Sequence, residues 1–254
     1  MTHNLMEYPI EIFDNHIFLI DKDKRFLIDT GSPSTISNGS SIEIFNEVYE
    51  TEETYHGANI EKLSDFVGCS FDALIGHNIL KNYIFQIDRS ADMDEEAVYL
   101  ADVEGIDLDS GFRKWDSLPE NREMWGIGED FITADFRGIP TIDISVNKKT
   151  IASWLDTGAK ISYINSNYVK GLTPVDYKKD FFPGYGEFEA PIYSLPMIFS
   201  KKEILFEFGV LPDLLERSML SGRTKAIVGA DIFYYYVLTF HCKENKIYIE
   251  IPPF

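Results

Sequence analysis

Cysteine is scarce in this chain of 254 residues. Only Cys69 and Cys242 are present, and they lie far apart in the sequence. Two cysteines cannot build the disulfide network that stabilises small secreted domains, so we expect both to be free thiols. Basic residues are also few, since 23 Lys and Arg stand against 42 Asp and Glu and give a formal net charge of −19. Because nucleic acids and anionic membranes are themselves negatively charged, this composition argues against general binding to either one.

Long apolar runs are absent as well. The densest one, at residues 234–240, is far too short to cross a bilayer. The first 20 residues lack the cationic start and apolar centre of a secretory signal. These absences predict a cytoplasmic protein that is not inserted in a membrane. The histidines, cysteines and acidic residues show no spacing typical of a metal site, and no phosphate-binding glycine loop occurs, so we expect neither a metal nor a cofactor.

The sequence does contain a pattern of short strands separated by polar turns. Apolar runs at 17–20 and 26–28 flank a charged segment at 21–25, which is typical of a β-hairpin. Residues 141–146 alternate between apolar and polar side chains, as a half-buried strand does. A turn at 147–149 and a return strand at 151–155 follow. Long amphipathic helical patterns are scarce, so the sequence predicts a mostly β protein with a few short helices.

The chain also repeats itself. An apolar strand followed by Asp-Thr-Gly occurs twice, and the two aspartates, Asp29 and Asp156, are 127 residues apart. An apolar-apolar-glycine segment also occurs twice, with its glycines, Gly76 and Gly229, 153 residues apart. The second copy therefore carries 26 additional residues between its two motifs. The repeated residues are Asp29, Thr30, Gly31 and Ser32 with Asp156, Thr157, Gly158 and Ala159, and Leu74, Ile75 and Gly76 with Ile227, Val228 and Gly229.

A two-fold repeat gives the paired aspartates a chemical meaning. One Asp-Thr-Gly triplet is commonly a plain turn, in which glycine permits a close approach of the backbone. Two triplets in pseudo-symmetric halves would bring equivalent strand ends together at the shared axis. Two carboxylates that meet there cannot both ionise, so they would share a proton and titrate as a coupled pair. One carboxylate can then activate a water molecule while the other acts as an acid on a carbonyl oxygen.

These paired motifs resemble aspartic peptidases of the pepsin and retropepsin type. The resemblance covers most of both halves and implies the acid-protease fold, which is mostly β with two pseudo-symmetric β lobes of the six-stranded type and a cleft between them. It implies an N-terminal lobe at 1–100, an acidic and polar connector at 101–125 and a C-terminal lobe at 126–254. It also implies that Asp29 and Asp156 are the catalytic pair, that Thr30 and Thr157 bond across the lobe interface, and that the apolar-glycine segments brace the aspartate loops.

The additional residues of the second copy contain a candidate flap. Strand-like flanks within residues 178–189 surround the tip Pro183, Gly184, Tyr185 and Gly186, which suits a hairpin turn. The tip resembles the glycine-rich flap of retropepsins, and we expect Tyr185 to lie over the cleft. An ordinary surface hairpin is the alternative. The first copy has no such hairpin, since its nearest substitute, at 55–59, has the composition of a loop. We therefore expect a single flap, carried by the second lobe.

The two aspartate loops differ at the residue after the glycine, which is Ser32 in the first and Ala159 in the second. In the family that the chain resembles, a hydroxyl at this position can bond the neighbouring aspartate and favour its ionised form. The resemblance therefore makes Asp29 the candidate for the charged partner at rest.

The sequence leads to two hypotheses of different classes. The first is a single-chain aspartic endopeptidase that needs no oligomer and hydrolyses peptide or protein substrates, extended and neutral to basic in charge. The second is a peptide- or protein-binding module on the same fold with weak or no catalysis, since a fold does not determine a function. Both intact triplets favour the enzyme, because a binding module has no physical need for two carboxylates that repel each other.

Overall fold

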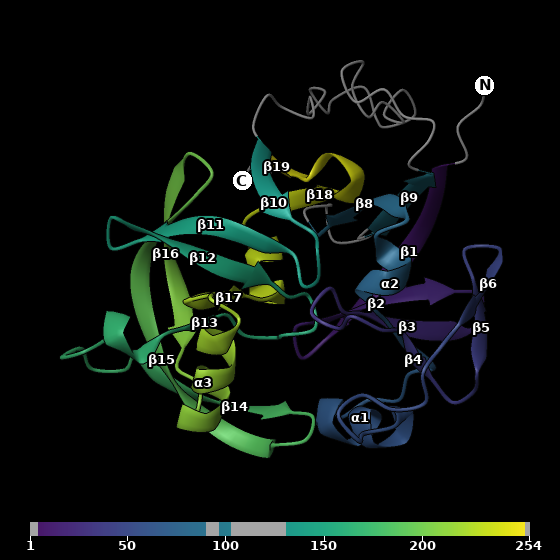
Figure 1. The fold of residues 1–254 in the computed structure, drawn as a ribbon, viewed down its shortest axis with the longest axis horizontal. Coiled ribbons are helices and arrows are strands. Elements are labelled where there is room, and N and C mark those ends of the chain that lie inside the picture. Colours follow the sequence, from purple (N-terminus) through teal and green to yellow (C-terminus); the bar gives the residue numbers. More distant parts are fainter. Residues whose placement is uncertain (1–4, 90–96, 103–130, 252–254) are drawn as a thin grey trace.

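The computed structural model describes residues 5–89, 97–102 and 131–251, and it is mostly β, as predicted (Figure 1). The connector expected at 101–125 lies almost wholly outside these residues. The strands form two sheet bodies, one from each half of the chain, and a third sheet that joins them. None of the helices in the described part of the chain has both the length and the apolar character needed to span a bilayer.

The first body is built from the first half of the chain. The predicted hairpin is present as two antiparallel strands, and the second of these runs parallel to the strand of the first apolar-glycine segment. Its strands are β1 (Leu5–Phe13), β2 (His16–Asp21), β3 (Lys24–Ile28), β4 (Ile36–Ser37) and β7 (Ala73–Ile75), with a separate pair β5 (Ser41–Ile44) and β6 (Glu47–Glu50). Helix α1 (Ile60–Val67) covers one side of this body, and α2 (His77–Leu80) follows β7.

The second body repeats this plan. Strand β12 runs parallel to β17 as β3 runs parallel to β7, and β13 pairs antiparallel with β17 as β4 does with β7. Its elements are β11 (Thr141–Val146), β12 (Lys149–Leu155), β13 (Tyr163–Ile164), η3 (Ser166–Tyr168), β14 (Asp176–Phe182), β15 (Gly186–Phe199), β16 (Lys202–Gly209), α3 (Asp213–Ser221), β17 (Ala226–Val228) and η4 (Ala230–Tyr234). The long β14–β15 hairpin contains the additional residues of the second copy.

A six-stranded antiparallel sheet joins the two bodies. Its order is β1-β9-β8-β18-β19-β10, so strands of the first half lie beside strands of the second. At the junction of β8 and β18, the rings of Phe85 and Phe240 stack with centroids 4.3 Å apart. The elements not yet given are β8 (Tyr83–Asp88), β9 (Ala97–Asp102), β10 (Phe131–Asp135), β18 (Val237–His241), η5 (Cys242–Glu244) and β19 (Lys246–Glu250).

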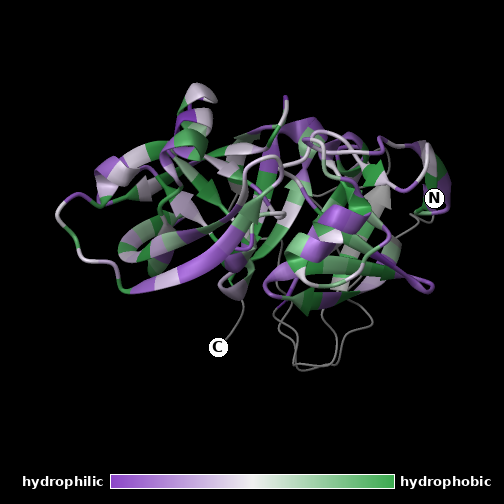
Figure 2. Cartoon of the chain, turned by 90° about the horizontal axis from the view of Figure 1, so that it is seen from below, coloured by the Kyte–Doolittle hydropathy of each residue, from purple (hydrophilic) through white to green (hydrophobic). Residues whose placement is uncertain are grey.

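Burial follows the strand pattern of the sequence. One apolar core runs through both bodies and the joining sheet, and two smaller cores lie beneath α1 and α3. Figure 2 shows hydrophobic residues on strands of both bodies. In β11 the predicted alternation is realised, because Ile142, Ile144 and Val146 are buried and Asp143 is exposed. Burying one face of each strand supplies most of the free energy that stabilises such a sheet.

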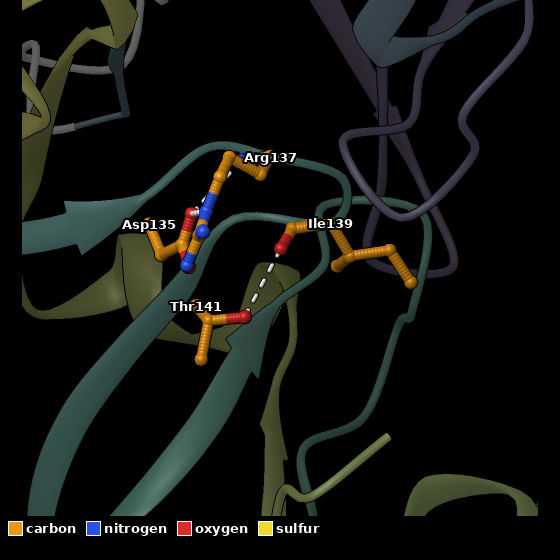
Figure 3. Close-up of polar contacts among 4 residues, drawn as sticks. All are labelled: Asp135, Arg137, Ile139 and Thr141. Atoms are coloured by element: carbon orange, nitrogen blue, oxygen red, sulfur yellow. Dashed lines mark hydrogen bonds and ion pairs between the residues drawn. The ribbon is translucent and has the colours of Figure 1, made fainter. Parts of the chain in front are cut away.

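The turn between β10 and β11 lies against the first body. The β10–β11 turn of the second body reaches α2 of the first, where the Phe136 carbonyl oxygen lies 3.1 Å from His77 Nε2. Within this turn Arg137 forms an ion pair with Asp135 at 2.6 Å, and the Thr141 hydroxyl donates to the carbonyl oxygen of Ile139 at 3.1 Å (Figure 3). Ile139 points away from the ion pair and lines the cavity described below.

Candidate active site

Both aspartates stand at the ends of buried strands. Asp29 follows β3 and Asp156 follows β12. The backbone N–H of Asp29 donates to the carbonyl oxygen of Ile75 at 3.0 Å, and that of Asp156 donates to Val228 at 2.9 Å. The apolar-glycine segments β7 and β17 are therefore the direct neighbours of the aspartate loops. This arrangement follows from the repeat, since each segment adds one parallel strand beside the strand that ends in aspartate.

Thr30 and Thr157 join the two loops by hydrogen bonds in both directions. The N–H of Thr30 donates to Thr157 Oγ1 at 2.9 Å, and the N–H of Thr157 donates to Thr30 Oγ1 at 3.0 Å. Each hydroxyl in turn donates across the interface, Thr30 to the carbonyl oxygen of Leu155 at 2.7 Å and Thr157 to that of Ile28 at 2.8 Å. Both threonines are fully buried, so these bonds set the spacing of the loops without competition from water.

The glycines of the triplets are needed because each faces the opposite carboxyl group. A Cβ atom added to Gly31 would lie 2.2 Å from Asp156 Cγ, and one added to Gly158 would lie 2.4 Å from Asp29 Cγ. Both distances are far below van der Waals contact. The two triplets therefore enclose each other, and each aspartate lies against the backbone of the other loop.

A second pair of hydrogen bonds braces the loops from behind. The N–H of Gly76 donates to Thr35 Oγ1 at 3.0 Å, and the N–H of Gly229 donates to Ser162 Oγ at 2.8 Å. Thr35 and Ser162 are themselves 127 residues apart, as the aspartates are. Sequence reasoning missed this pair, although the spacing of the repeat was sufficient to find it.

The hydroxyls of this second pair have different partners. Thr35 donates to Asn78 Oδ1 at 2.8 Å, whereas Ser162 donates to the carboxyl group of Asp231. Asn78 and Asp231 occupy equivalent places, 153 residues apart. The support is therefore a neutral amide in the first body and an ionisable acid in the second. Burial raises the pKa of Asp231 to about 6.

The two catalytic candidates hydrogen-bond to each other, and burial raises the pKa of both. Asp29 is 8% exposed, and the neighbouring charge of Asp156 raises its pKa further. The hydrogen bonds that Asp156 accepts, from Asp29 and from the backbone N–H groups of Gly158, Ala159 and Gly31, favour its ionised form. Asp29 likewise accepts backbone hydrogen bonds, from Ser32 and Gly31, so the two carboxyl groups titrate as one coupled pair.

The Ser32 hydroxyl does not make the bond to Asp29 that the resemblance implies. The Ser32 hydroxyl donates to the carbonyl oxygen of Ser34 at 2.7 Å, and only the backbone N–H of Ser32 reaches Asp29 Oδ1, at 2.9 Å. The expected hydroxyl bond to Asp29 is absent because the nearby carbonyl oxygen of Ser34 takes the hydroxyl proton, so Ser32 gives no reason to make Asp29 the charged partner.

A cavity of about 280 Å³ contains both carboxyl groups. Its apolar walls come in equivalent pairs from the two bodies, with Leu27 matched by Trp154 and Leu74 matched by Ile227 at the repeat spacings. Two helices add further apolar side chains, which are Leu63 and Val67 from α1 and Leu215 and Met219 from α3. Helix α1 is held in place by Asn59, whose side chain accepts a hydrogen bond from the N–H of Lys62.

The β14–β15 hairpin of the second body closes the cavity and reaches the first body. Phe181 and Phe182, at the end of β14, line the cavity. The ring of Phe181 stacks on Phe66 of α1 with centroids 5.0 Å apart, and Phe182 lies 5.6 Å from His56. Figure 1 shows β14 extending toward α1. Aromatic contacts between the bodies therefore hold the cover in place.

The tip of the hairpin lies differently from the sequence expectation. Tyr185 is 41% exposed and packs on Phe188 of its own hairpin, with ring centroids 5.9 Å apart. Gly184 and Gly186 do not line the cavity, and of the four expected tip residues only Pro183 does. The expectation that Tyr185 lies over the cleft was wrong, because the hairpin directs its preceding phenylalanines inward instead.

Tyr55 also covers the cavity, from the first body. Two backbone hydrogen bonds between Tyr55 and Ala58, of 2.8 and 2.9 Å, close its loop. Burial raises the pKa of Tyr55, and the charges of Asp29 and Asp156 raise it further. The sequence indicated only a loop here and a single flap in the second half. The described residues instead cover the carboxyl groups from both bodies.

Other chemistries find little support in the described residues. Within them, no group of three or more His, Cys, Asp or Glu side chains is arranged to hold a metal ion. Both cysteines are free, and burial raises the pKa of the Cys242 thiol to about 12 and also raises that of Cys69. A raised pKa leaves little thiolate near neutral pH, so neither cysteine is a candidate nucleophile.

No family model and no curated protein matches the sequence. Among solved structures, the Simian Foamy Virus (mac) protease is similar with a TM-score of 0.28 and 13% identity, covering 36% of this chain and 88% of its own. A retropepsin-like aspartic protease from Rickettsia conorii is similar with a TM-score of 0.36 and 19% identity, covering 48% of this chain and 89% of its own.

Proposed function

We propose that this chain is an aspartic endopeptidase that hydrolyses peptide bonds with Asp29 and Asp156. The observation that carries the proposal is the pair of hydrogen-bonded carboxyl groups inside a covered cavity, where burial raises the pKa of both. A structural role alone gives no reason to keep two acids together in such a place, because burying a charge costs free energy. Perturbed acids in a cavity are the expected mark of acid–base chemistry.

The proposed reaction has two steps. In the first, a water molecule loses a proton to Asp156 while its oxygen bonds to the peptide carbonyl carbon, and Asp29 gives its proton to the carbonyl oxygen. In the second, the proton on Asp156 passes to the peptide nitrogen, the C–N bond breaks, and one hydroxyl proton of the intermediate returns to Asp29. One water is consumed, a carboxylic acid and an amine form, and both carboxyl groups recover their starting states.

In the proposed enzyme, two lobes enclose the substrate. An N-terminal lobe spans residues 1–100 and a C-terminal lobe spans 126–254, with the cleft between them. The substrate is an extended peptide segment that binds beneath the β14–β15 hairpin, partly by main-chain hydrogen bonds to a strand edge. Because both aspartates belong to one chain, the proposed chemistry needs no oligomer.

The test compares the unmodified protein with Asp29→Asn and Asp156→Asn. Each protein is incubated with a diverse mixture of unstructured peptides between mildly acidic and neutral pH, and mass spectrometry records new peptide ends. Asp176→Asn is the matched control, because Asp176 is an exposed acid on β14 outside the cavity. We expect cleavage by the unmodified protein and by the control, and its loss in both dyad variants.

Two other results would count against the proposal. Cleavage that persists in either dyad variant would show that the pair is not responsible. A folded protein that cuts no peptide, yet binds peptides in equilibrium dialysis of the same mixture, would favour the peptide-binding module instead.

A further inference from the structure

Asp180 is a third acid of the cavity, and the proposed reaction does not use it. It lies on β14, lines the cavity and is 9% exposed. Its carboxyl group accepts hydrogen bonds from the hydroxyl of Tyr163 and from the backbone N–H of Phe181, the latter at 2.8 Å. Both donors are neutral. Among the described residues, no lysine or arginine forms an ion pair with Asp180, although buried acids are usually paired.

The charge of the whole cavity has one sign. The described residues that line it include three carboxyl groups, those of Asp29, Asp156 and Asp180, and no lysine or arginine. The two histidines of its lining are His16 and His56. Burial lowers the pKa of His16 to about 4, so its ring is neutral near pH 7. A ligand group that carries charge into this cavity is therefore favoured when it is positive.

His16 adds an independent sign of a missing partner. It is 2% exposed, and its Nδ1 has no hydrogen-bond partner among the described residues. Its ring faces Phe181 with centroids 6.3 Å apart, and it lines the same cavity as Asp180. A buried nitrogen without a partner costs free energy, so a ligand that donates a hydrogen bond there would gain affinity.

Lys160 is the nearby cation, and it is already engaged. It forms an ion pair with Asp14 at 2.6 Å and does not line the cavity. From outside the cavity, the charge of Lys160 lowers the pKa of Asp180 and of His16, and the charge of Asp14 raises both. Burial is the largest influence on Asp180 and raises its pKa despite Lys160, so a cation bound on the cavity side would favour its ionised form.

We propose that Asp180, Tyr163 and His16 form a subsite that binds the cationic side chain of a lysine or arginine in the peptide substrate. The subsite lies on the side of Asp156, since Tyr163 begins β13, the strand that follows the Asp156 loop. An ammonium or guanidinium group offers several donors, so it can bond the Asp180 carboxylate and still have donors for other acceptors of the cavity lining. This inference rests on the proposed peptidase function and names the substrate class that its cavity selects.

The effect is expected to be large because the charge is buried. A hydrogen bond to a charged group inside a protein changes affinity by roughly ten- to hundredfold. The apolar walls would bind the hydrocarbon stem of the same side chain. A glutamate at this place would be rejected, because it would meet three carboxyl groups and no cation.

The test uses peptides that are identical except at one position, which carries lysine, norleucine or glutamate and is moved along the peptide. Values of kcat/KM are measured for the unmodified protein, Asp180→Asn and Asp176→Asn. Asp176 is the matched control, since it lies on the same strand and accepts a hydrogen bond from the N–H of the next residue, as Asp180 does, but is exposed. The same peptides are also measured for equilibrium binding to Asp29→Asn.

At one position of the peptide, we expect kcat/KM for the lysine peptide to exceed that for the norleucine peptide by about tenfold or more. The glutamate peptide should have the lowest kcat/KM. Asp180→Asn should lower kcat/KM for the lysine peptide about tenfold more than it lowers kcat/KM for the norleucine peptide. Asp176→Asn should preserve the lysine preference. Absence of a lysine preference in the unmodified protein overturns the subsite, whether or not Asp180→Asn folds. A preference that survives in folded Asp180→Asn overturns it as well.

The binding measurement separates this inference from the proposed function. If lysine peptides bind selectively to Asp29→Asn but the unmodified protein cleaves none of them, the subsite stands and the peptidase proposal fails. If peptides are cleaved without regard to lysine, the peptidase proposal stands and the subsite fails.

Discussion

The hydroxyl of Thr30 accepts a hydrogen bond from the backbone N–H of Thr157 at 3.0 Å, and the hydroxyl of Thr157 accepts one from the N–H of Thr30 at 2.9 Å. Each hydroxyl also donates to a strand carbonyl of the opposite body. The two aspartate loops are thus tied together by four buried hydrogen bonds. The position of one carboxyl group relative to the other depends on these bonds as well as on the strands that carry them.

The first prediction concerns Thr157→Val, which keeps the shape of the side chain and removes its hydroxyl. The N–H of Thr30 and the carbonyl oxygen of Ile28 would lose their buried partner. We expect the free energy of unfolding to fall by about 2–4 kcal/mol in urea titrations, since an unsatisfied buried group costs about 1–3 kcal/mol. Thr157→Ser is the control, because it retains the hydroxyl. A valine variant as stable as the serine variant would contradict this account.

The second prediction concerns Gly31→Ala. The added methyl group would lie 2.2 Å from Asp156 Cγ, so the carboxyl group must move. Overpacking of this kind costs about 1–3 kcal/mol of stability. We expect thermal or urea unfolding to show this decrease in the free energy of unfolding. Peptide cleavage should be lost as well. Gly39→Ala is the matched control, since its nearest neighbour would be Ser41 O at 3.9 Å. Equal behaviour of the two variants would refute the close approach.

The third prediction concerns pH and Asp231. Its folded pKa of about 6 lies above its ordinary value of 3.8, so the folded state holds the proton more tightly than the unfolded state. The free energy of unfolding attributable to Asp231 therefore falls as pH rises from about 4 to 6, and the full cost is present above that window. Asp231→Asn removes the titration, and Asn78 already fills the equivalent place in the first body.

We expect Asp231→Asn to be more stable than the unmodified protein by about 1–3 kcal/mol at pH 7, with the difference shrinking toward pH 4. Urea titrations of both proteins at several pH values measure it. The comparison between the two proteins cancels the titration of all other groups. A difference that does not change between pH 4 and 7 would show that Asp231 does not titrate in this window.

The fourth prediction concerns the contact between Phe181 and Phe66. Phe181→Leu keeps an apolar side chain but removes the aromatic stacking between the bodies. Aromatic pairs contribute about 0.5–1.5 kcal/mol beyond burial, so backbone amides at 176–190 should exchange with solvent about two- to tenfold faster. Hydrogen exchange with mass spectrometry measures this. Tyr185→Leu is the control, since Tyr185 packs within the hairpin. Similar exchange rates in both variants would argue against stabilisation of the hairpin by Phe181.

Local features of the fold were predictable from sequence patterns. The hairpin of β2 and β3, the strand β11 and the hairpin at 178–189 all appear where apolar periodicity and turn residues place them. The second strand of the β11–β12 hairpin begins at Lys149, two residues earlier than expected, because pairing with β11 continues to the turn. Thr35 and Ser162 were overlooked, although their spacing repeats that of the aspartates.

The sequence by itself determined the two-fold repeat, and with it which strands end in aspartate and which apolar-glycine segment lies beside each. These are matters of local pattern and spacing, which the chain carries without reference to distant parts. Only the tertiary structure decided that Ser32 donates to Ser34 and that Phe181 turns inward where Tyr185 does not. It also brought Tyr55 and Asp180 into the same cavity. Hydrogen-bond partners and side-chain directions depend on which groups of the other body are within reach, and residue spacing carries no information about that.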